Sequence, residues 1–549
     1  MNRGSLHLEI QRHRKSCYGL LRTTYWDKKA KKIKHTSHGR LTGLDHETLK
    51  LIQAALKGKA RLATDADIPR ATNSKEYGAS FAALQLAKEL ELDKAIYSKP
   101  QQQWVKDCLA MIAGRLVYAG SKLSLSNRYK DTALWELCGV DGEVEVDEHC
   151  YAGMDRLLER QKSIQQKLAA KHFDGNALVL YDITSSYFEG EYDASQIVKF
   201  GYNRDRKRGR EQMVIGLICT AKGCPIGIEV FPGNTKDETT VVDKITEMQK
   251  DYKITELIFV GDRGMVTQAN LEKVKDTRGL NTISALTHPQ IKDLLSRKVI
   301  QMDLFDEKNI IEIIDPDNPK RRYCLCKNLE SARRETHTRN ALLEKAKEGL
   351  EKIAASKRKA TTEQISARVG KLLSKTKMSK YISWEVKDKK LQWSIDENLV
   401  DTEQLIDGCY IITSDVPPEK MVSQEIVASY KKLTLVEKAF RNLKTVQLEI
   451  RPVYHKTDDR IRCHVFICML AYYIQWHMAK RLQPLFATDG KHEKRFWTFE
   501  NVIERLKSIR REEIHVAGAT CKIVTDPDDY QAAILNLLNV KLHSHKREK

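Results

Sequence analysis

Two aspartates follow short apolar segments that have the composition of buried strands. Asp182 comes after residues 177–181, and Asp262 comes after residues 257–261. At the carboxyl ends of strands in an α/β sheet, acidic side chains project into the crevice where ligands bind. A single aspartate in such a place is more often a turn residue or a helix cap. The pair alone therefore favours a metal or ligand site only modestly.

A third acid, Glu437, lies in a segment that predicts an amphipathic helix. At about 100° per residue, four polar side chains of this helix lie within about 60° of one another. They are Tyr430, Glu437, Arg441 and Lys444. An apolar stripe beside them, at Val436 and Phe440, would pack against a core. The alternative is an i,i+4 pair between Glu437 and Arg441 on a surface helix, and this segment alone leaves both interpretations open.

The elements that must position these acids form a mixed α/β pattern. Residues 175–290 alternate β-like runs with helical stretches, and two of the runs form a predicted hairpin. Before them, apolar residues recur at three- and four-residue steps and predict a helical region over 71–174. Residues 291–422 combine charged helices with short strands and have the character of an insertion. The helical segment 423–485 and a helical tail over 486–549 follow.

The positive charge of the chain is concentrated near its start. The net charge of +20 and the pI of about 9.2 indicate a polyanionic partner. Between Met1 and Arg61, fifteen Lys and Arg residues stand against four Asp and Glu residues. We therefore expect residues 1–70 to form a basic DNA-binding region that lies on phosphates, with a solvated surface as the alternative.

Composition and motifs exclude several classes of protein. With 41% hydrophobic residues in 549, the chain can bury more than one core. It has neither a phosphate-binding loop nor a dinucleotide fingerprint. The closest cysteines, Cys324 and Cys326, lack a second pair and a nearby histidine, so we expect reduced thiols rather than a zinc site. The apolar stretch 465–474 is too short to span a bilayer, so we expect a buried helix and a cytoplasmic protein without membrane association.

Several segments together resemble the insertion-sequence transposases of the IS-four-like superfamily. The signature Y-x2-R-x3-E-x6-K is matched at Tyr430, Glu437 and Lys444, with Leu433 at the arginine position. Further matches are YDITSSYFEG around Asp182, GNTKDETT from Gly233, VGDRGMVTQANLEKV around Asp262, and the RPVYH and RI-x2-H elements at residues 451–455 and 460–464. These last two elements are typical of one branch of the superfamily.

This resemblance implies a ribonuclease-H-like catalytic core, with an insertion before the last catalytic helix and a helical N-terminal region before the core. It also implies that Asp182, Asp262 and Glu437 form the catalytic and metal-binding triad, with Asp182 shared by two Mg²⁺ (or Mn²⁺) ions. Two such ions, about 4 Å apart, activate the attacking oxygen and stabilise the leaving oxygen of a phosphodiester. Carboxylates suit these hard cations better than they suit zinc.

Cations around the triad are the expected DNA contacts. The resemblance implies that Tyr430 and Lys444 hold a phosphate of the transposon end, and Arg441 is the candidate to replace the missing arginine. The basic segment 200–210 is expected to contact the DNA backbone, with a solvated loop as the alternative. The expected DNA-binding residues are Tyr430, Arg441, Lys444, Arg204, Arg206, Lys207, Arg208, Arg451 and His455.

The sequence therefore predicts a DNA transposase. We expect it to bind terminal inverted repeats of double-stranded DNA, to cleave strands with metal ions, and to transfer the exposed 3′-hydroxyls to target DNA. Two ends must be handled together, so we expect at least a homodimer in the synaptic complex, associated with the nucleoid. Two alternatives stay open: a ribonuclease-H-like endonuclease without strand transfer, and a domesticated DNA-binding protein without catalysis.

Overall fold

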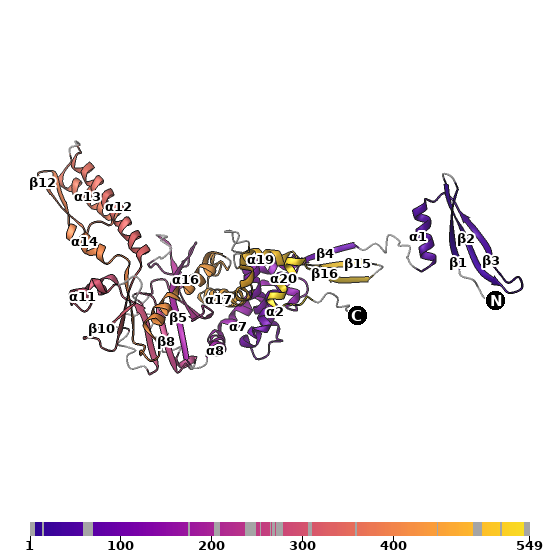
Figure 1. Cartoon of the computed structure of the whole chain (residues 1–549), viewed down its shortest axis with the longest axis horizontal. Coiled ribbons are helices and arrows are strands. Elements are labelled where there is room, and N and C mark those ends of the chain that lie inside the picture. The colour runs from indigo at the N-terminus through magenta and orange to yellow at the C-terminus, as the bar shows by residue number, and fades with distance from the viewer. Residues whose placement is uncertain are drawn as a thin grey trace. The chain divides into compact units, whose positions relative to one another are not determined.

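A computed structural model describes most of the 549-residue chain (Figure 1). The described residues are 6–13, 16–58, 70–173, 176–202, 209–236, 249–252, 254–263, 265, 270, 278–305, 310–356, 360–446, 448–486, 497–516 and 519–542. The chain divides into two units, which are described separately here. The first comprises residues 1–77, 507–528 and 541–549, and the second comprises residues 78–506 and 529–540.

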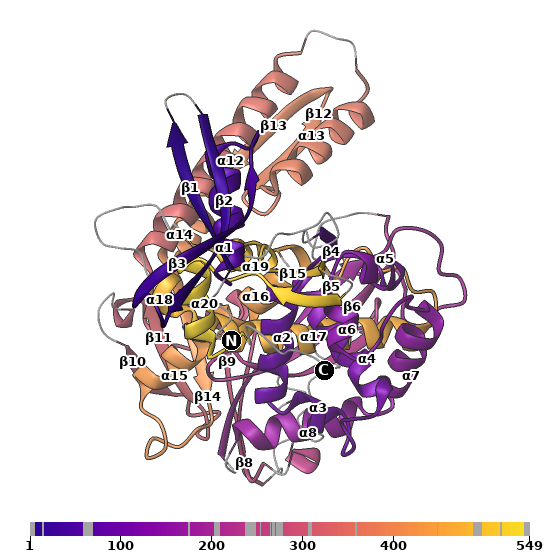
Figure 2. The same cartoon turned by 90° about the vertical axis from the view of Figure 1, so that its right-hand side faces the viewer.

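The second unit is built on an eight-stranded mixed sheet with the order β10-β11-β14-β9-β8-β5-β6-β7 (Figures 1 and 2). Its strands are β5 (Asn176–Tyr187), β6 (Gln212–Thr220), β7 (Pro225–Pro232), β8 (Glu256–Gly261), β9 (Leu280–Ala285), β10 (Ile311–Ile314), β11 (Arg322–Lys327) and β14 (Cys409–Ser414). Strand β5 is parallel to β8, and β8 is parallel to β9. The other neighbouring pairs are antiparallel. The predicted mixed α/β class is confirmed.

Strands β6 and β7 form the predicted hairpin at one edge of the sheet. Strand β6 is buried along its whole length, which explains its nearly continuous run of apolar residues. The turn between the two strands contains Gly223 at φ +79°, in the left-handed region that glycine adopts at least cost. A Cβ atom at Gly223 would lie 3.0 Å from the Cβ atom of Leu435, so this turn packs closely against a later helix.

Helices fill the chain between Gly78 and His172. They are α2 (Gly78–Glu89), α3 (Leu92–Ile96), α4 (Gln103–Val117), α5 (Lys122–Asn127), α6 (Leu134–Leu137), α7 (Ala152–Leu158) and α8 (Gln161–His172). Helix α17 (Asp458–Arg481) contacts α4, α7 and strand β7, so it joins these helices to the sheet. Most of its side chains from Ile461 to Gln475 are buried, and the predicted buried helix over residues 465–474 is confirmed.

The predicted helix around Glu437 is two helices. Helix α15 (Ser423–Lys431) ends before Lys432, and α16 (Leu433–Arg441) begins after it and continues as a π-helical segment, Asn442–Val446. The buried side chains of α16 include Val436, Ala439 and Phe440, and the helix contacts β5. The apolar stripe expected from the sequence thus docks the helix that carries Glu437 on β5, the strand that carries Asp182.

A helical subdomain leaves the sheet between β11 and β14. It comprises α12 (Leu329–Ala354), α13 (Thr362–Thr376), β12 (Ile382–Lys387), β13 (Lys390–Ile395) and α14 (Glu397–Leu405), with its own cluster of buried residues around Leu350 and Val369. Helices α12 and α13 lie side by side (Figures 1 and 2). The sequence placed the whole of residues 291–422 in an insertion, which is wrong for β10, β11 and β14. These strands extend the main sheet, where β14 pairs with β9. The two strands are far apart in sequence, so no local pattern reveals this pairing.

The first unit contains a three-stranded antiparallel sheet with one helix. Strands β1 (Leu6–His13), β2 (Ser16–Asp27) and β3 (Lys32–Leu41) are followed by α1 (His46–Leu56), which packs on the sheet through Leu49 and Leu8. Gly19 lies beneath them, since a Cβ atom there would be 2.8 Å from a methyl of Leu8. Most of the described residues in the basic region predicted over residues 1–70 therefore lie in strands.

A second sheet of the first unit corrects the predicted helical tail over residues 486–549. Helices α19 (Phe499–Lys507) and α20 (Asp529–Leu538) are present, but β15 (Arg510–Val516) and β16 (Ala519–Val524) lie between them. Strand β15 pairs with both β16 and β4 (Arg70–Glu76). Because β4 lies more than four hundred residues earlier, the pairing that makes this segment a strand is not visible locally.

Within the described residues, no single helix has the length and apolar character needed to cross a membrane. Helix α4 and the segment Lys122–Lys130 meet those criteria only as a pair bent by 97°.

Candidate active site

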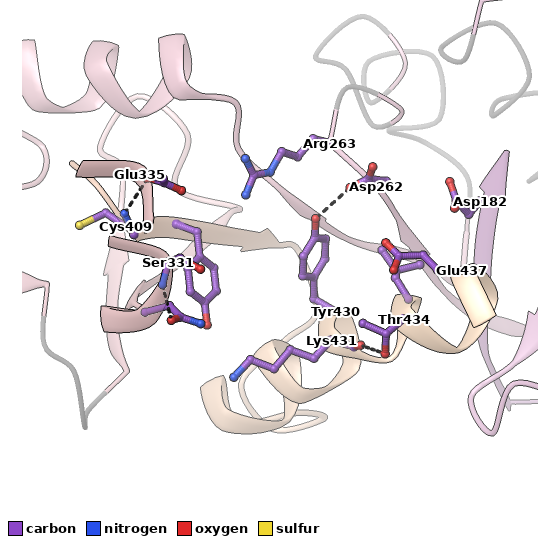
Figure 3. Close-up of a pocket in the computed structure, with 14 residues that line it drawn as sticks. Asp182, Asp262, Arg263, Ser331, Glu335, Cys409, Tyr430, Lys431, Thr434 and Glu437 are labelled. Atoms are coloured by element: carbon purple, nitrogen blue, oxygen red, sulfur yellow. Dashed lines mark hydrogen bonds between the residues drawn. The ribbon is translucent and has the colours of Figure 1, made fainter. Parts of the chain in front are cut away.

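The three predicted acids line one pocket of about 280 Å³ in the second unit (Figure 3). Asp182 comes from β5, Asp262 follows β8, and Glu437 comes from α16. Figure 3 shows the three carboxylates around a common space, with Glu437 between the two aspartates. Segments far apart in the sequence thus supply one acidic wall.

The sheet register explains why the two aspartates are neighbours. Tyr181 of β5 lies beside Gly261 of β8 in the parallel pair, so the next residues, Asp182 and Asp262, leave the pair at the same level. The sequence placed both acids at strand ends, and this is correct for Asp262 only. Strand β5 continues to Tyr187 because its pairing with β6 extends beyond the end of β8.

Tyr430 of α15 holds Asp262 in place. Its hydroxyl donates a hydrogen bond to Oδ1 of Asp262 at 3.1 Å. Burial raises the pKa of Tyr430, and the negative charge of Asp262 raises it further, so the phenol stays protonated and remains a donor. On β5, the backbone N–H of Ile183 donates to Oδ1 of Asp182 at 2.8 Å. Each aspartate therefore has one oxygen held by the protein.

The donor set fits a hard divalent cation. Carboxylate oxygens are the ligands that Mg²⁺ and Mn²⁺ prefer. Cys409 also lines the pocket, but its Sγ–H donates to the carbonyl oxygen of Leu405. Among the described residues, the oxygens of the three acids do not form a group within 4.8 Å of one another. The three acids are therefore not closed around a single ion.

Two cations in the pocket wall were not predicted. Arg263 directly follows Asp262, and Lys431 directly follows Tyr430. The Arg263 guanidinium contacts Tyr430 and opposes the rise in its pKa. The segment VGDRG carried a signal for Arg263, because a cation next to a metal-binding acid is well placed for a phosphate.

The opposite wall comes from the helical subdomain. Asn328 caps α12 by accepting a hydrogen bond from the N–H of Ser331, and both residues line the pocket. Glu335, one turn further, accepts a hydrogen bond from the N–H of Gly408 at 3.0 Å. These residues have no sequence signal of function, since a capped, charged helix is an ordinary surface feature.

Lys444 and Arg451 line a different pocket, of about 420 Å³, together with Tyr187 and Glu449. The Arg451 guanidinium lies over the Tyr187 ring, 4.1 Å from its centroid. Tyr187 ends β5, the strand that carries Asp182. This second pocket thus adjoins the strand of the acidic site but does not share its wall.

The other expected DNA-binding residues have different surroundings. Arg441 is exposed at the end of α16. His455 is only 8% exposed, packs against Tyr151 and His464, and has a pKa that burial lowers to about 3. The expectation that His455 contacts DNA is therefore corrected: it is a neutral core residue. The cations Arg204, Arg206, Lys207 and Arg208 lie outside the described residues.

Comparisons with known proteins show the family to which this region of the chain belongs. A family model described as "Transposase DDE domain" matches residues 177–474, which include all three acids. No curated protein matches the sequence. Among solved structures, the chain is similar to a cryo-EM structure of the piggyBac transposase synaptic complex with hairpin DNA. The identity is 8% and the TM-score 0.35, over 78% of this chain and 79% of the other. Because the family model spans more than half of the 549 residues, the chain belongs to the transposase DDE domain family.

Proposed function

We propose that this transposase cleaves DNA strands at the ends of a mobile element and joins them to target DNA. The main support is that Asp182, Asp262 and Glu437 come from three separate elements and line one pocket. The strand order β7-β6-β5-β8-β9 around the two aspartates supports a ribonuclease-H-like core, with β5 and β8 as its acid-bearing strands. The motifs at Tyr430, Glu437 and Lys444 support a place in the IS-four-like superfamily.

The three carboxylates would hold two Mg²⁺ or Mn²⁺ ions, which supply Lewis-acid activation of the attacking oxygen and charge stabilisation of the leaving oxygen. Tyr430 holds one carboxylate oxygen of Asp262 by a hydrogen bond, and the other oxygen would be the one to bind a metal ion. Arg263 and Lys431 give the same wall positive charge for a DNA phosphate. The chain's own residues thus supply both the acidic site and a means to hold the backbone.

The sheet of the first unit supports a role in binding the terminal repeats. α1 covers one face of this sheet, and the register places Arg22, Tyr18 and Arg40 on the other. The Arg40 guanidinium stacks on the Tyr18 ring at 3.5 Å, and Arg22 pairs with Glu9. Strand β3 is exposed along nearly its whole length. β-sheets of this size present such side chains to base edges in a groove of DNA.

The test of the proposal is a product assay. The purified chain is incubated with Mg²⁺ and a plasmid that carries the DNA flanking its coding sequence on both sides. We expect cut ends and joined products in which the ends are linked to new DNA. Cut DNA without joined products would instead support the endonuclease alternative. Binding without any nick, in Mg²⁺ or Mn²⁺, would contradict an enzymatic function.

Replacing Tyr430 with phenylalanine is expected to slow cleavage by roughly 10- to 100-fold. A hydrogen bond to a charged group contributes about 1.5–3 kcal/mol, and each 1.4 kcal/mol is about tenfold in rate. Tyr430 acts through Asp262 and is a positioning residue, so the Mg²⁺ concentration for half-maximal rate should rise as well. The measurement is the nicking rate of wild type and variant across a Mg²⁺ series. An unchanged rate and unchanged Mg²⁺ dependence would show that this hydrogen bond does not position Asp262.

A further inference from the structure

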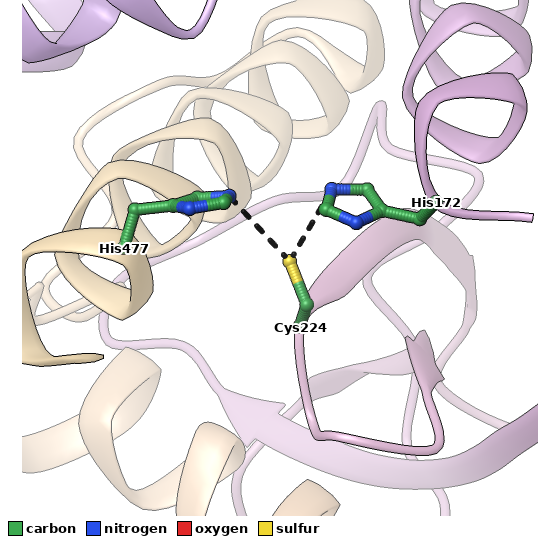
Figure 4. A group of neighbouring side chains, drawn as sticks. All are labelled: His172, Cys224 and His477. Carbon is green, nitrogen blue, oxygen red and sulfur yellow. Dashed lines mark hydrogen bonds between the residues drawn. The ribbon is translucent and has the colours of Figure 1, made fainter.

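Three side chains of the second unit form a cluster outside the carboxylate pocket (Figure 4). His172 is the last residue of α8, Cys224 follows the turn after β6, and His477 lies on α17. The Sγ atom of Cys224 is 3.7 Å from Nε2 of His172 and 4.0 Å from Nε2 of His477. One ligand atom of each residue lies within 4.8 Å of the other two.

The spacing of these atoms is close to that of ligands on one zinc ion. Zn–S bonds of about 2.3 Å and Zn–N bonds of about 2.0–2.1 Å place tetrahedral N and S ligands about 3.6 Å apart. The observed separations of 3.7 and 4.0 Å are slightly longer. Small rotations of the side chains would bring all three atoms to bonding distance of an ion between them.

The donor set differs in kind from that of the acidic pocket. Imidazole nitrogen and thiolate sulfur bind zinc-like ions, whereas Mg²⁺ and Mn²⁺ select oxygen. We propose that His172, Cys224 and His477 form a second metal site, for a thiophilic ion of the zinc type. Three protein ligands would leave a fourth position open. The Tyr473 hydroxyl is a further oxygen near the cluster, 3.1 Å from Nε2 of His172, a nitrogen that would exchange this hydrogen bond for the metal. Water or this phenol completes the coordination.

The surroundings keep the ligands available. Tyr473 packs against both rings, at 5.7 Å from His172 and 4.7 Å from His477 between centroids, which fixes their orientation. Cys224 is 1% exposed, so its sulfur is shielded from other thiols and oxidants.

A bound ion would join three elements that contact the sheet edge. It would link the end of α8, the β6–β7 turn and α17, which are far apart in sequence. Gly223, next to Cys224, packs against Leu435 of α16, the helix that carries Glu437. The site would therefore restrain the turn on which the acid-bearing helix rests.

Helix α17 also supplies a matched control. The Sγ atom of Cys468 is 3.9 Å from Nε2 of His464, so it forms a similar thiol–imidazole pair. In the part of the chain that the structure describes, this pair belongs to no three-ligand group. Cys468→Ser removes a buried thiol from the same helix and should leave metal binding unchanged.

The test is a titration of the full-length chain with Co²⁺, in an Asp182→Asn/Glu437→Gln background that weakens binding at the oxygen site. We expect roughly one equivalent of cobalt with tetrahedral and thiolate-to-metal absorption, displaced by Zn²⁺. Cys224→Ser should remove the thiolate absorption. His477→Gln, a half-buried change, should lower Zn²⁺ affinity by more than about 100-fold, which exceeds the effect of outer-shell changes.

Circular dichroism of each variant separates a lost site from a lost fold. If the folded chain shows no thiolate-to-cobalt absorption, or if folded Cys224→Ser keeps it, the proposal is overturned. The readout does not depend on DNA cleavage, so its failure would leave the proposed transposase activity untouched.

Discussion

Replacing Glu437 with glutamine is expected to reduce DNA strand cleavage about 100- to 1000-fold, on the scale seen when a group that stabilises transition-state charge is removed. The amide keeps the size of the side chain but loses the negative charge that a metal ion needs. Since Glu437 is exposed on α16, whose packing on β5 depends on other residues, the fold and DNA binding should persist. The measurements are plasmid nicking, mobility shift with the element's end DNA, and circular dichroism.

Glu425→Gln is the matched control for this change. Glu425 lies on the neighbouring helix α15, outside the pocket, and accepts a hydrogen bond from the N–H of Val422 that glutamine can also accept. Its cleavage rate should stay close to that of wild type. Asp182→Asn and Asp262→Asn should behave like Glu437→Gln, because the three acids act as one unit. Cleavage by Glu437→Gln at the wild-type rate would remove Glu437 from the site.

Replacing Asp407 with alanine is expected to destabilise the helical subdomain by about 3–5 kcal/mol, the typical cost of breaking a buried ion pair. Asp407 and Arg339 of α12 are each 8% exposed, and Nη1 of Arg339 donates to Oδ1 of Asp407 at 2.7 Å. Thr336 donates to the other oxygen at 2.7 Å. Without Asp407, the Arg339 guanidinium would stay buried without its counter-charge. The loss of stability is measured as faster hydrogen exchange of the backbone amides of α12.

Two further variants make this prediction specific. Glu330 and Arg334 form an exposed pair on the same helix, so Glu330→Ala should change exchange little. The double variant Arg339→Met/Asp407→Leu replaces the buried pair with apolar side chains of similar volume and should recover most of the protection. Equal exchange in Asp407→Ala and Glu330→Ala would show that the buried pair does not anchor α12.

Site residues whose positions depend on local sequence patterns could be predicted, whereas those positioned by contacts between distant segments could not. The strand-like patterns before Asp182 and Asp262 were predicted from local sequence, and it is the register of β5 and β8 that makes the two acids neighbours. Glu437 comes 175 residues after Asp262, and only the resemblance to a family placed it with them. Its helix packs on β5 through ordinary apolar residues, which would fit many other surfaces.

The strand pairings and the side-chain cluster that the sequence did not predict depend on contacts at long range. Strand β14 joins the sheet through β9, and β15 forms because β4 is available as a partner. The cluster of His172, Cys224 and His477 has no motif, since its members are spread over more than half of the chain. Local composition predicts where a helix or strand forms. Which strand pairs with it, or which side chains meet to form a metal site, is seen only in the folded chain.

Helix α12 has one end in the wall of the acidic pocket and the other in the subdomain core. At 26 residues it is about 39 Å long, given a rise of about 1.5 Å per residue. A rigid rod of that length is a lever: a tilt of about 5° at its capped end moves its far end by about 3 Å. Asn328 and Ser331 at the other end line the pocket, so a tilt of the helix about its far end would move this wall by a similar distance. A contact that changes the tilt of α12 would therefore change the shape of the pocket that the three acids line.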